Sequence, residues 1–315
     1  MNNLFKRSLV VLAALALMIG GLFVSTPSAQ AEAEKLDVVV TTTHMKDLLE
    51  VVGGEHVKVT GLMGPGVDPH GYEPTPSDID AVNNADLVGY NGLHLEAMFT
   101  DIFEKMAESD DVNIFSLEEA LKDGQVLDYV YEDKDLDLDP HIWFDIQIWQ
   151  QATQLVADKL AEVDPDNAKD YQANADAYVK ELDELDKQIA DLVAEVPEES
   201  RYLVTAHDAF SYFGKNYGFN VESIQGLNTQ TEAGTGDIAK VADLVIDKKI
   251  KACFIESSVS DRNVKALVEA VEAKGGNLEI GGELYSDALG TDEEKAGNYI
   301  DGYVTNISTI VNALK

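Results

Sequence analysis

The stretch DPDNAKDYQANADAYVKELDELDKQIADLVAEVP, residues 164–197, decides the architecture of this chain. Its apolar positions recur at alternating spacings of four and three: Tyr171, Ala175, Tyr178, Leu182, Leu185, Ile189, Leu192 and Val196. That period places them on one stripe of a helix, and the prolines at its two ends are typical start and stop signals. A helix of about 30 residues spans roughly 45 Å. We therefore expect one long rigid helix, with a coiled-coil dimer seam as the alternative.

Strand-like runs alternate with helical patterns on both sides of this helix. They lie at 36–41, 57–63, 86–90 and 112–115 before it, and at 202–206, 219–225, 251–256 and 277–282 after it. Such alternation is typical of parallel sheets covered by helices. We therefore predict an α/β fold of two (β/α)4-type lobes with a cleft between them. The predicted N-terminal lobe is 32–163, the linker helix lies within 164–196, and the C-terminal lobe is 197–315.

The first residues have the pattern of an export signal. A basic pair at 6–7 precedes an apolar run at 9–24 and a small-x-small cleavage site at 29–31. The apolar run is short for a membrane-spanning helix, which needs about 20 residues. We expect residues 1–31 to be a signal peptide, with an uncleaved anchor as the alternative. No cysteine ends this segment, so the expected product is a periplasmic or secreted protein without a lipid anchor.

The composition excludes several classes of function. The chain has 58 acidic and 23 basic residues and a formal charge of −35. This balance argues against partners such as nucleic acid or anionic lipid, which need basic patches. The single cysteine, Cys253, lies in a strand-like run, so we expect no disulfide and a buried thiol. No P-loop motif is present, so the chain does not supply an ATPase itself.

Two copies of one tripeptide carry the chemistry. Asp68-Pro69-His70 and Asp139-Pro140-His141 lie about seventy residues apart, each after an apolar run. Proline fixes its own φ and restricts its neighbour, so a histidine beside it loses little freedom as a ligand. His207 follows the first strand of the second lobe, where binding crevices form in open α/β sheets. These three histidines predict one metal site assembled in the cleft.

A carboxylate from the second lobe is the expected fourth ligand. Asp287 follows the last predicted strand and fits this role, while Glu283 and Glu256 compete with it. Glu256 could instead orient His207 through the second ring nitrogen, a common role for carboxylates around metals. Imidazole suits zinc, iron, nickel, copper and, less avidly, manganese.

The remaining three histidines are weaker candidates for metal ligands. His44 ends the first strand and is expected behind the ligands, His56 lies in a polar turn, and His94 follows a strand end. The acidic segment 122–139 is expected to be a long surface loop leading to His141.

Six stretches together resemble one family. They are DPHGYEPTPSD, ADLVGYNGLHLE, DPHIWFD, TAHDAFSYFGKNYG, FIESSV and GGELYSDALG, in this order along the chain. The set resembles the TroA-like metal-binding proteins of zinc and manganese ABC importers. The resemblance implies a monomer that is not an enzyme and that delivers Zn²⁺ or Mn²⁺ to a membrane permease with a cytoplasmic ATPase. It places the ligands of one site on His70, His141, His207 and Asp287.

The sequence is compatible with either Zn²⁺ or Mn²⁺. Some manganese-specific relatives have glutamate at the position of His207, and zinc-specific ones often have a histidine-rich loop where this chain has an acidic one. Three imidazoles and a carboxylate suit tetrahedral Zn²⁺, and a bidentate Asp287 would offer five ligands to Mn²⁺. A secreted zinc hydrolase is the main rival, but catalytic zinc usually keeps three protein ligands and a water. A metal-binding cell-adhesion protein is the second rival, although no adhesive repeat is visible.

Overall fold

The computed structural model describes residues 35–109, 112–129, 137–231 and 233–315. The predicted signal peptide, residues 1–31, lies outside them. Within the described residues, no helix combines the length and apolar character that crossing a membrane requires.

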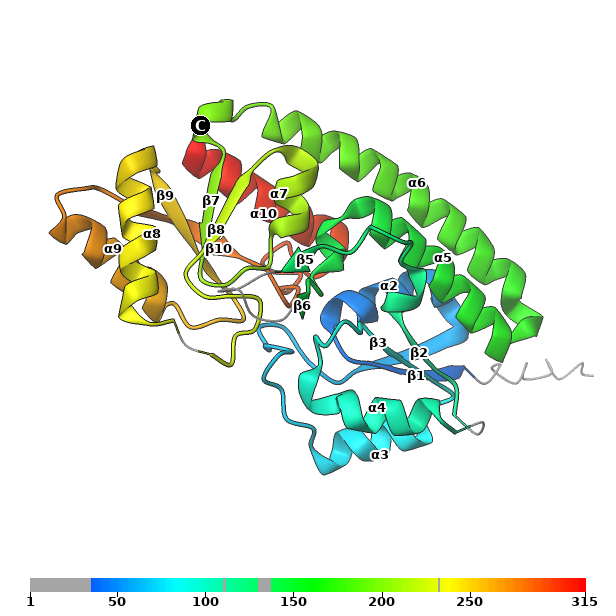
Figure 1. The fold of residues 1–315 in the computed structure, drawn as a ribbon. Helices are drawn as coiled ribbons and strands as arrows, with labels where there is room; N and C mark the ends of the chain where they lie inside the picture. The colour runs from blue at the N-terminus through cyan, green and yellow to red at the C-terminus, as the bar shows by residue number, and fades with distance from the viewer. Residues whose placement is uncertain (1–34, 110–111, 130–136, 232) are drawn as a thin grey trace, which may run out of the picture. The chain divides into compact units, whose positions relative to one another are not determined.

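The first lobe contains a four-stranded parallel sheet in the order β2-β1-β3-β4 (Figure 1). Its strands are β1 (Leu36–Val40), β2 (Val57–Gly61), β3 (Leu87–Tyr90) and β4 (Ile114–Ser116). Its helices are α2 (Thr43–Gly53), α3 (Pro76–Asn84), α4 (Thr100–Ala107) and α5 (Ile146–Val163). All four strands lie where the alternating pattern predicts them.

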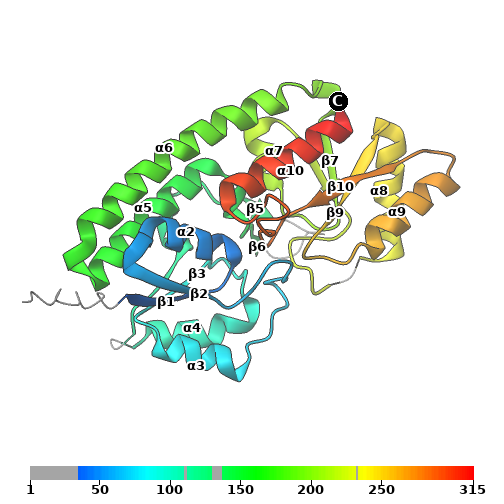
Figure 2. The ribbon, with the colours of Figure 1, turned by 180° about the vertical axis from the view of Figure 1, so that it is seen from behind.

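The second lobe has two parallel pairs of strands, β7 with β8 and β9 with β10. The two pairs lie next to each other, because β7 contacts β9; β7, β9 and β10 are labelled in Figure 2. The strands are β7 (Tyr202–Thr205), β8 (Asn220–Ser223), β9 (Ala252–Glu256) and β10 (Glu279–Leu284). The helices are α7 (Ser211–Tyr217), α8 (Thr235–Lys248), α9 (Arg262–Ala273) and α10 (Tyr299–Leu314). The predicted two-lobed α/β architecture with parallel sheets is confirmed.

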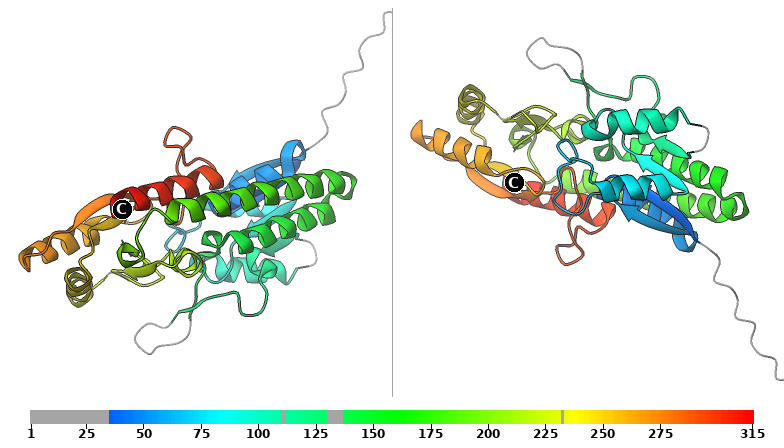
Figure 3. Two further views of the ribbon diagram at one scale, coloured as in Figure 1. Left: turned by 90° about the horizontal axis from the view of Figure 1, so that it is seen from above. Right: turned by 90° about the horizontal axis from the view of Figure 1, so that it is seen from below.

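The long linker helix is α6 (Ala168–Val193), preceded by a 3-10 turn at Pro165–Asn167. Its apolar stripe is buried within the chain against α2, α5 and α10, and Figure 3 shows α10 beside the C-terminal half of α6. The stripe follows the prediction except near its end, where Val193 is buried and Leu192 only partly. A straight helix drifts away from a strict 3.5-residue repeat, which accounts for this shift. Because intramolecular neighbours cover the stripe, it needs no coiled-coil partner.

One hydrophobic core extends through both lobes. It includes Val38 of β1, Trp149 of α5, Leu182 of α6 and Ile307 of α10. Such continuous packing makes a large hinge motion between the lobes costly, because close-packed interiors do not deform continuously. Cys253 is buried in the second lobe as expected, and burial raises the pKa of its thiol to about 12.

The acidic segment 122–139 is not entirely a loop. Two short antiparallel strands, β5 (Asp128–Tyr129) and β6 (Asp137–Leu138), bring its two ends together. Residues 130–136 between them lie outside the described residues. Two-residue strands carry too little sequence pattern to be predicted.

Candidate metal centre

Four side chains converge in the cleft between the lobes. One ligand-type atom from each of His70, His141, His207 and Asp287 lies within 4.8 Å of the other three. All four residues are buried, with exposed fractions of 3, 0, 0 and 1 per cent. Asp287 Oδ1 lies 3.4 Å from His141 Nε2 and 3.3 Å from His207 Nε2. Among the described residues no other such group was found.

The topology explains this convergence. His70 follows β2, and His207 and Asp287 follow β7 and β10 at the carboxyl ends of their strands. Loops at that end of a parallel sheet line the binding crevice. His141 comes from the segment between β6 and α5, so each lobe supplies two of the four groups.

His141 is fixed by a carboxylate from its own tripeptide. Asp139 Oδ1 accepts hydrogen bonds from His141 N at 3.0 Å and pairs with His141 Nδ1 at 2.7 Å. Asn91 Nδ2 donates to Pro140 O at 3.0 Å, and Tyr212 Oη donates to Asp139 O at 2.9 Å. With Nδ1 occupied, Nε2 is the nitrogen that faces the cluster.

His207 has a matching carboxylate in Glu256. Glu256 Oε2 lies 2.6 Å from His207 Nδ1, while Glu256 Oε1 accepts from the backbone N of Ala206 and His207. Glu256 thus sits behind His207, where the orienting role requires it, and not in the cluster. The other competitor for the fourth position, Glu283, is exposed on β10.

His70 has a different setting. Asp68 Oδ1 accepts from His70 N at 2.9 Å, but Asp68 Oδ2 accepts from Thr229 Oγ1 of the second lobe at 2.5 Å. Gln230 Nε2 donates to His70 O, also at 2.5 Å. The first tripeptide is therefore tied to the opposite lobe, and its aspartate does not serve the imidazole ring.

The charges of the cluster are strongly coupled. Burial alone would lower the pKa of His141 and His207, but Asp139, Glu256 and Asp287 outweigh it. They raise the pKa of His141 to about 9 and that of His207 well above its usual range. Burial opposes ionisation of Asp287, yet the two imidazoles hold its pKa well below the usual value. Burial lowers the pKa of His70 to about 3.

Several polar atoms of the cluster lack hydrogen-bond partners. They are the Nε2 atoms of His70, His141 and His207 and Oδ1 of Asp287, all buried. Buried polar groups without partners are rare because leaving them unpaired is costly. Three imidazole nitrogens and one carboxylate oxygen pointing at one spot form a donor set that a divalent metal ion satisfies.

The other histidines stand apart from the cluster. His44 is buried and stacks on Trp143 with ring centroids 4.9 Å apart, as its expected place behind the ligands suggests. Burial lowers its pKa to about 3. His56 Nε2 lies 3.0 Å from Asp170 Oδ2 at the surface. His94 is exposed and has a φ of 61°, in the left-handed region.

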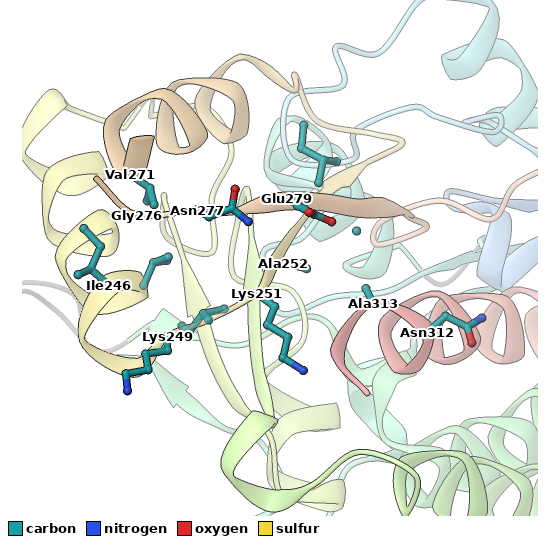
Figure 4. A pocket seen from close by; sticks show the side chains of 14 residues that line it. Ile246, Lys249, Lys251, Ala252, Val271, Gly276, Asn277, Glu279, Asn312 and Ala313 are labelled. Carbon is teal, nitrogen blue, oxygen red and sulfur yellow. The ribbon is translucent and has the colours of Figure 1, made fainter. Parts of the chain in front are cut away.

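A larger cavity lies elsewhere, at the amino ends of β9 and β10. It has a volume of about 720 Å³ and includes Ile246, Lys249, Lys251 and Ile280 in its lining (Figure 4). It contains no histidine and faces away from the carboxyl ends of the strands. The four donor atoms of the metal centre lie within 4.8 Å of one another, away from this cavity.

Sequence reasoning missed two contacts of the site. The pairing of Asp139 with the imidazole of His141 was not expected, although aspartate two residues before the histidine occurs in both tripeptides. The contact of Ser258 Oγ with Asp287 Oδ2, at 3.3 Å, had no signal in the sequence.

The fold and the cluster together define a class: two-lobed α/β binding proteins with a buried, metal-type donor set in the cleft. The profile of the family described as "Zinc-uptake complex component A periplasmic" matches residues 38–313. The chain belongs to this family.

Individual relatives agree with this assignment. The manganese-binding lipoprotein MntA of Bacillus subtilis is 42% identical over 92% of this chain and 94% of its own length. The zinc-binding protein TroA of Treponema pallidum is 39% identical over 94% of this chain and 95% of its own length. The solved structure of that periplasmic zinc-binding protein superposes with a TM-score of 0.84, covering 89% of this chain and 99% of the other.

Proposed function

We propose that this protein is an extracytoplasmic substrate-binding protein that captures Zn²⁺ or Mn²⁺ between its lobes and delivers it to an ABC permease. The observation that carries the proposal is the meeting of four buried, unpartnered donor atoms within 4.8 Å of one another. Relatives of this chain are named for manganese and for zinc, which supports a metal cargo.

The ligands in this proposal are the Nε2 atoms of His70, His141 and His207 and the carboxylate of Asp287. Asp139 and Glu256 hold two of the imidazoles through the other ring nitrogen, which fixes their orientation and raises their basicity. Ser258 Oγ lies near Asp287 Oδ2 and leaves Oδ1 for the metal. One oxygen and three nitrogens suit tetrahedral Zn²⁺. Mn²⁺ would require Asp287 to offer both oxygens.

A closed donor set supports capture over catalysis. Four protein ligands leave no position for the water that a zinc hydrolase activates. The cargo is then passed to a membrane permease that a separate ATPase drives. In this proposal residues 1–31 are an export signal, 32–163 and 197–315 are the lobes, and 164–196 contain the linker. The protein acts as a monomer outside the cytoplasm.

The proposal is tested by metal content and affinity. Protein purified without chelators is analysed for bound elements and then titrated competitively with Zn²⁺ and Mn²⁺. We expect one ion per chain, and His207→Ala should lower its affinity by orders of magnitude. The matched control is His56→Ala, which removes a surface imidazole. Unchanged affinity in His207→Ala would remove this residue from the site, and absence of tight binding in the parent protein would refute the function.

Bound metal should also stabilise the fold. A ligand that binds only the folded state adds about 2.7 kcal/mol at a concentration of 100 times its Kd. The melting temperature should therefore rise with either ion in the parent protein and in His56→Ala, but not in His207→Ala.

A further inference from the structure

The closed metal site has no open path to solvent through its own ligands, since none is more than 3 per cent exposed. A segment must move before an ion enters or leaves. The loop Asn228–Gln230, which follows β8, makes two hydrogen bonds across the cleft to the first tripeptide. We call these two hydrogen bonds the clasp: Thr229 Oγ1 donates to Asp68 Oδ2, and Gln230 Nε2 donates to His70 O.

A second cavity lies directly beside the clasp. It has a volume of about 220 Å³ and is lined by Asp68, Gln225, Thr229, Ser258, Val259, Ser260, Arg262 and Asn263. Asp68 and Thr229 belong to the clasp, and Ser258 contacts the carboxylate of Asp287. The cavity therefore adjoins the metal centre on two sides, through the loop of His70 and through Asp287.

The lining suits a hydrated cation in transit. Most of the side chains around the cavity offer hydroxyl, amide or carboxylate oxygens, which are the groups that hydrated divalent ions accept as neighbours. Arg262 also lines the cavity, and the carboxylate of Asp68 lies on the side that leads to His70. Asp68 and Thr229 line the cavity, and the hydrogen bond between them ties the loop of His70 to the second lobe at this point.

We propose that this cavity is the port of the metal site and that the clasp is its gate. This inference rests on the proposed function, because it concerns how that cargo is exchanged. Breaking the clasp lets the first tripeptide swing outward with His70, while His141, His207 and Asp287 stay in place. His70 is thus the last ligand to engage an incoming ion and the first to leave. Thr229 and Gln230 are positioning residues for His70 and touch no metal.

The test measures rates of metal exchange. Zn²⁺ release is followed by stopped flow into a chelating dye, and association by mixing protein with free Zn²⁺. In the double variant Thr229→Val, Gln230→Ala we expect association and release each to quicken by about tenfold, as two hydrogen bonds are lost. The equilibrium Kd should change by less than about threefold, because the barrier changes and the four ligands do not.

A second variant acts in the opposite direction. Ser260→Trp places a large ring at the exposed rim of the cavity, where it should slow both rates without unfolding the protein. The control for the Thr229→Val change is Thr235→Val, at an exposed threonine at the start of α8, which should leave both rates unchanged. Unaltered rates in both the clasp and the rim variants, with tight Zn²⁺ binding intact, would overturn the port. Loss of Zn²⁺ binding in the parent protein would instead refute the proposed function.

Discussion

The two Asp-Pro-His tripeptides share three residues and one local hydrogen bond, yet their surroundings differ. In each, the aspartate accepts from the backbone N of the histidine, at 2.9 Å in the first and 3.0 Å in the second. The second loop then enters the core, where Ile142, Trp143 and Phe144 are all buried. The first loop runs along the surface, with Gly71 and Glu73 exposed. The motif therefore fixes a turn, and the flanking residues decide whether that turn is rigid.

The partners of the two loops follow this difference. The second loop is held by Asn91, Tyr212 and Tyr299, all buried or nearly so. The first loop is held by Thr229 and Gln230, at the edge of the cleft. His141 is thus held by residues of the buried core, whereas His70 is held by two side chains at the edge of the cleft.

The largest contrast should appear when each histidine is removed. His141→Ala should abolish tight metal binding and also destabilise the fold by about 3–5 kcal/mol, because buried carboxylates lose their partner. His70→Ala should weaken affinity by orders of magnitude with little loss of stability, since its ring takes part in none of the close carboxylate pairs that hold His141 and His207. Isothermal titration and chemical unfolding measure both quantities. Equal loss of stability in the two variants would break the contrast.

The two aspartates should differ next. Asp139→Asn removes the charge behind His141 and should cost 10–100-fold in metal affinity, which is the usual effect of such outer partners. Asp68→Asn should change the Kd by less than about threefold, because Asp68 serves the backbone and Thr229. Competitive titration of both variants with Zn²⁺ decides this, and similar losses would show that the tripeptides are equivalent.

The pH dependence of affinity should report the second loop and not the first. His141, with a pKa of about 9, carries a proton at neutral pH that a metal ion must displace. Affinity should therefore fall steadily as the pH is lowered from 9. His70, with a pKa of about 3, is already neutral and adds no slope above pH 4. Asp139→Asn should reduce the slope measured from pH 9 to 6 and leave the part that His207 contributes, because Glu256 and Asp287 raise the pKa of His207 as well. An unchanged slope would contradict this assignment.

The smallest contrast concerns the supporting amides. Asn91→Ala removes two buried hydrogen bonds, to Gly92 O and Pro140 O, and should cost about 1–3 kcal/mol of unfolding free energy. Gln230→Ala alters an exposed side chain and should stay within about 0.5 kcal/mol. Urea unfolding of both variants distinguishes them. A larger effect from Gln230 would mean that the first loop contributes to the fold itself.

Much of the architecture could be predicted because local pattern and fold agree. The eight predicted strands are distinct runs that alternate with helical patterns, and the long helix has a strong period and proline signals at its ends. The candidate ligands were recognised because polar residues at strand ends meet in this fold and because ordered motifs resemble one family. Whether each tripeptide loop is buried or exposed could be predicted only in part from the sequence, from the apolar residues after His141 and the glycine after His70. The partners Thr229, Gln230 and Asn91 come from distant segments, so no local pattern identifies them.

The stacking of Trp143 against the cleft has a spectroscopic consequence. The chain has two tryptophans, and Trp143 lies 5.3 Å from the ring of His141 and 4.9 Å from that of His44. Trp149 instead stacks on Tyr299, away from the donor atoms. Indole emission responds to nearby charge, so arrival of a cation should alter the fluorescence of one indole and leave the other as an internal reference. Metal binding can therefore be followed by the intrinsic tryptophan fluorescence of the protein, without an attached dye.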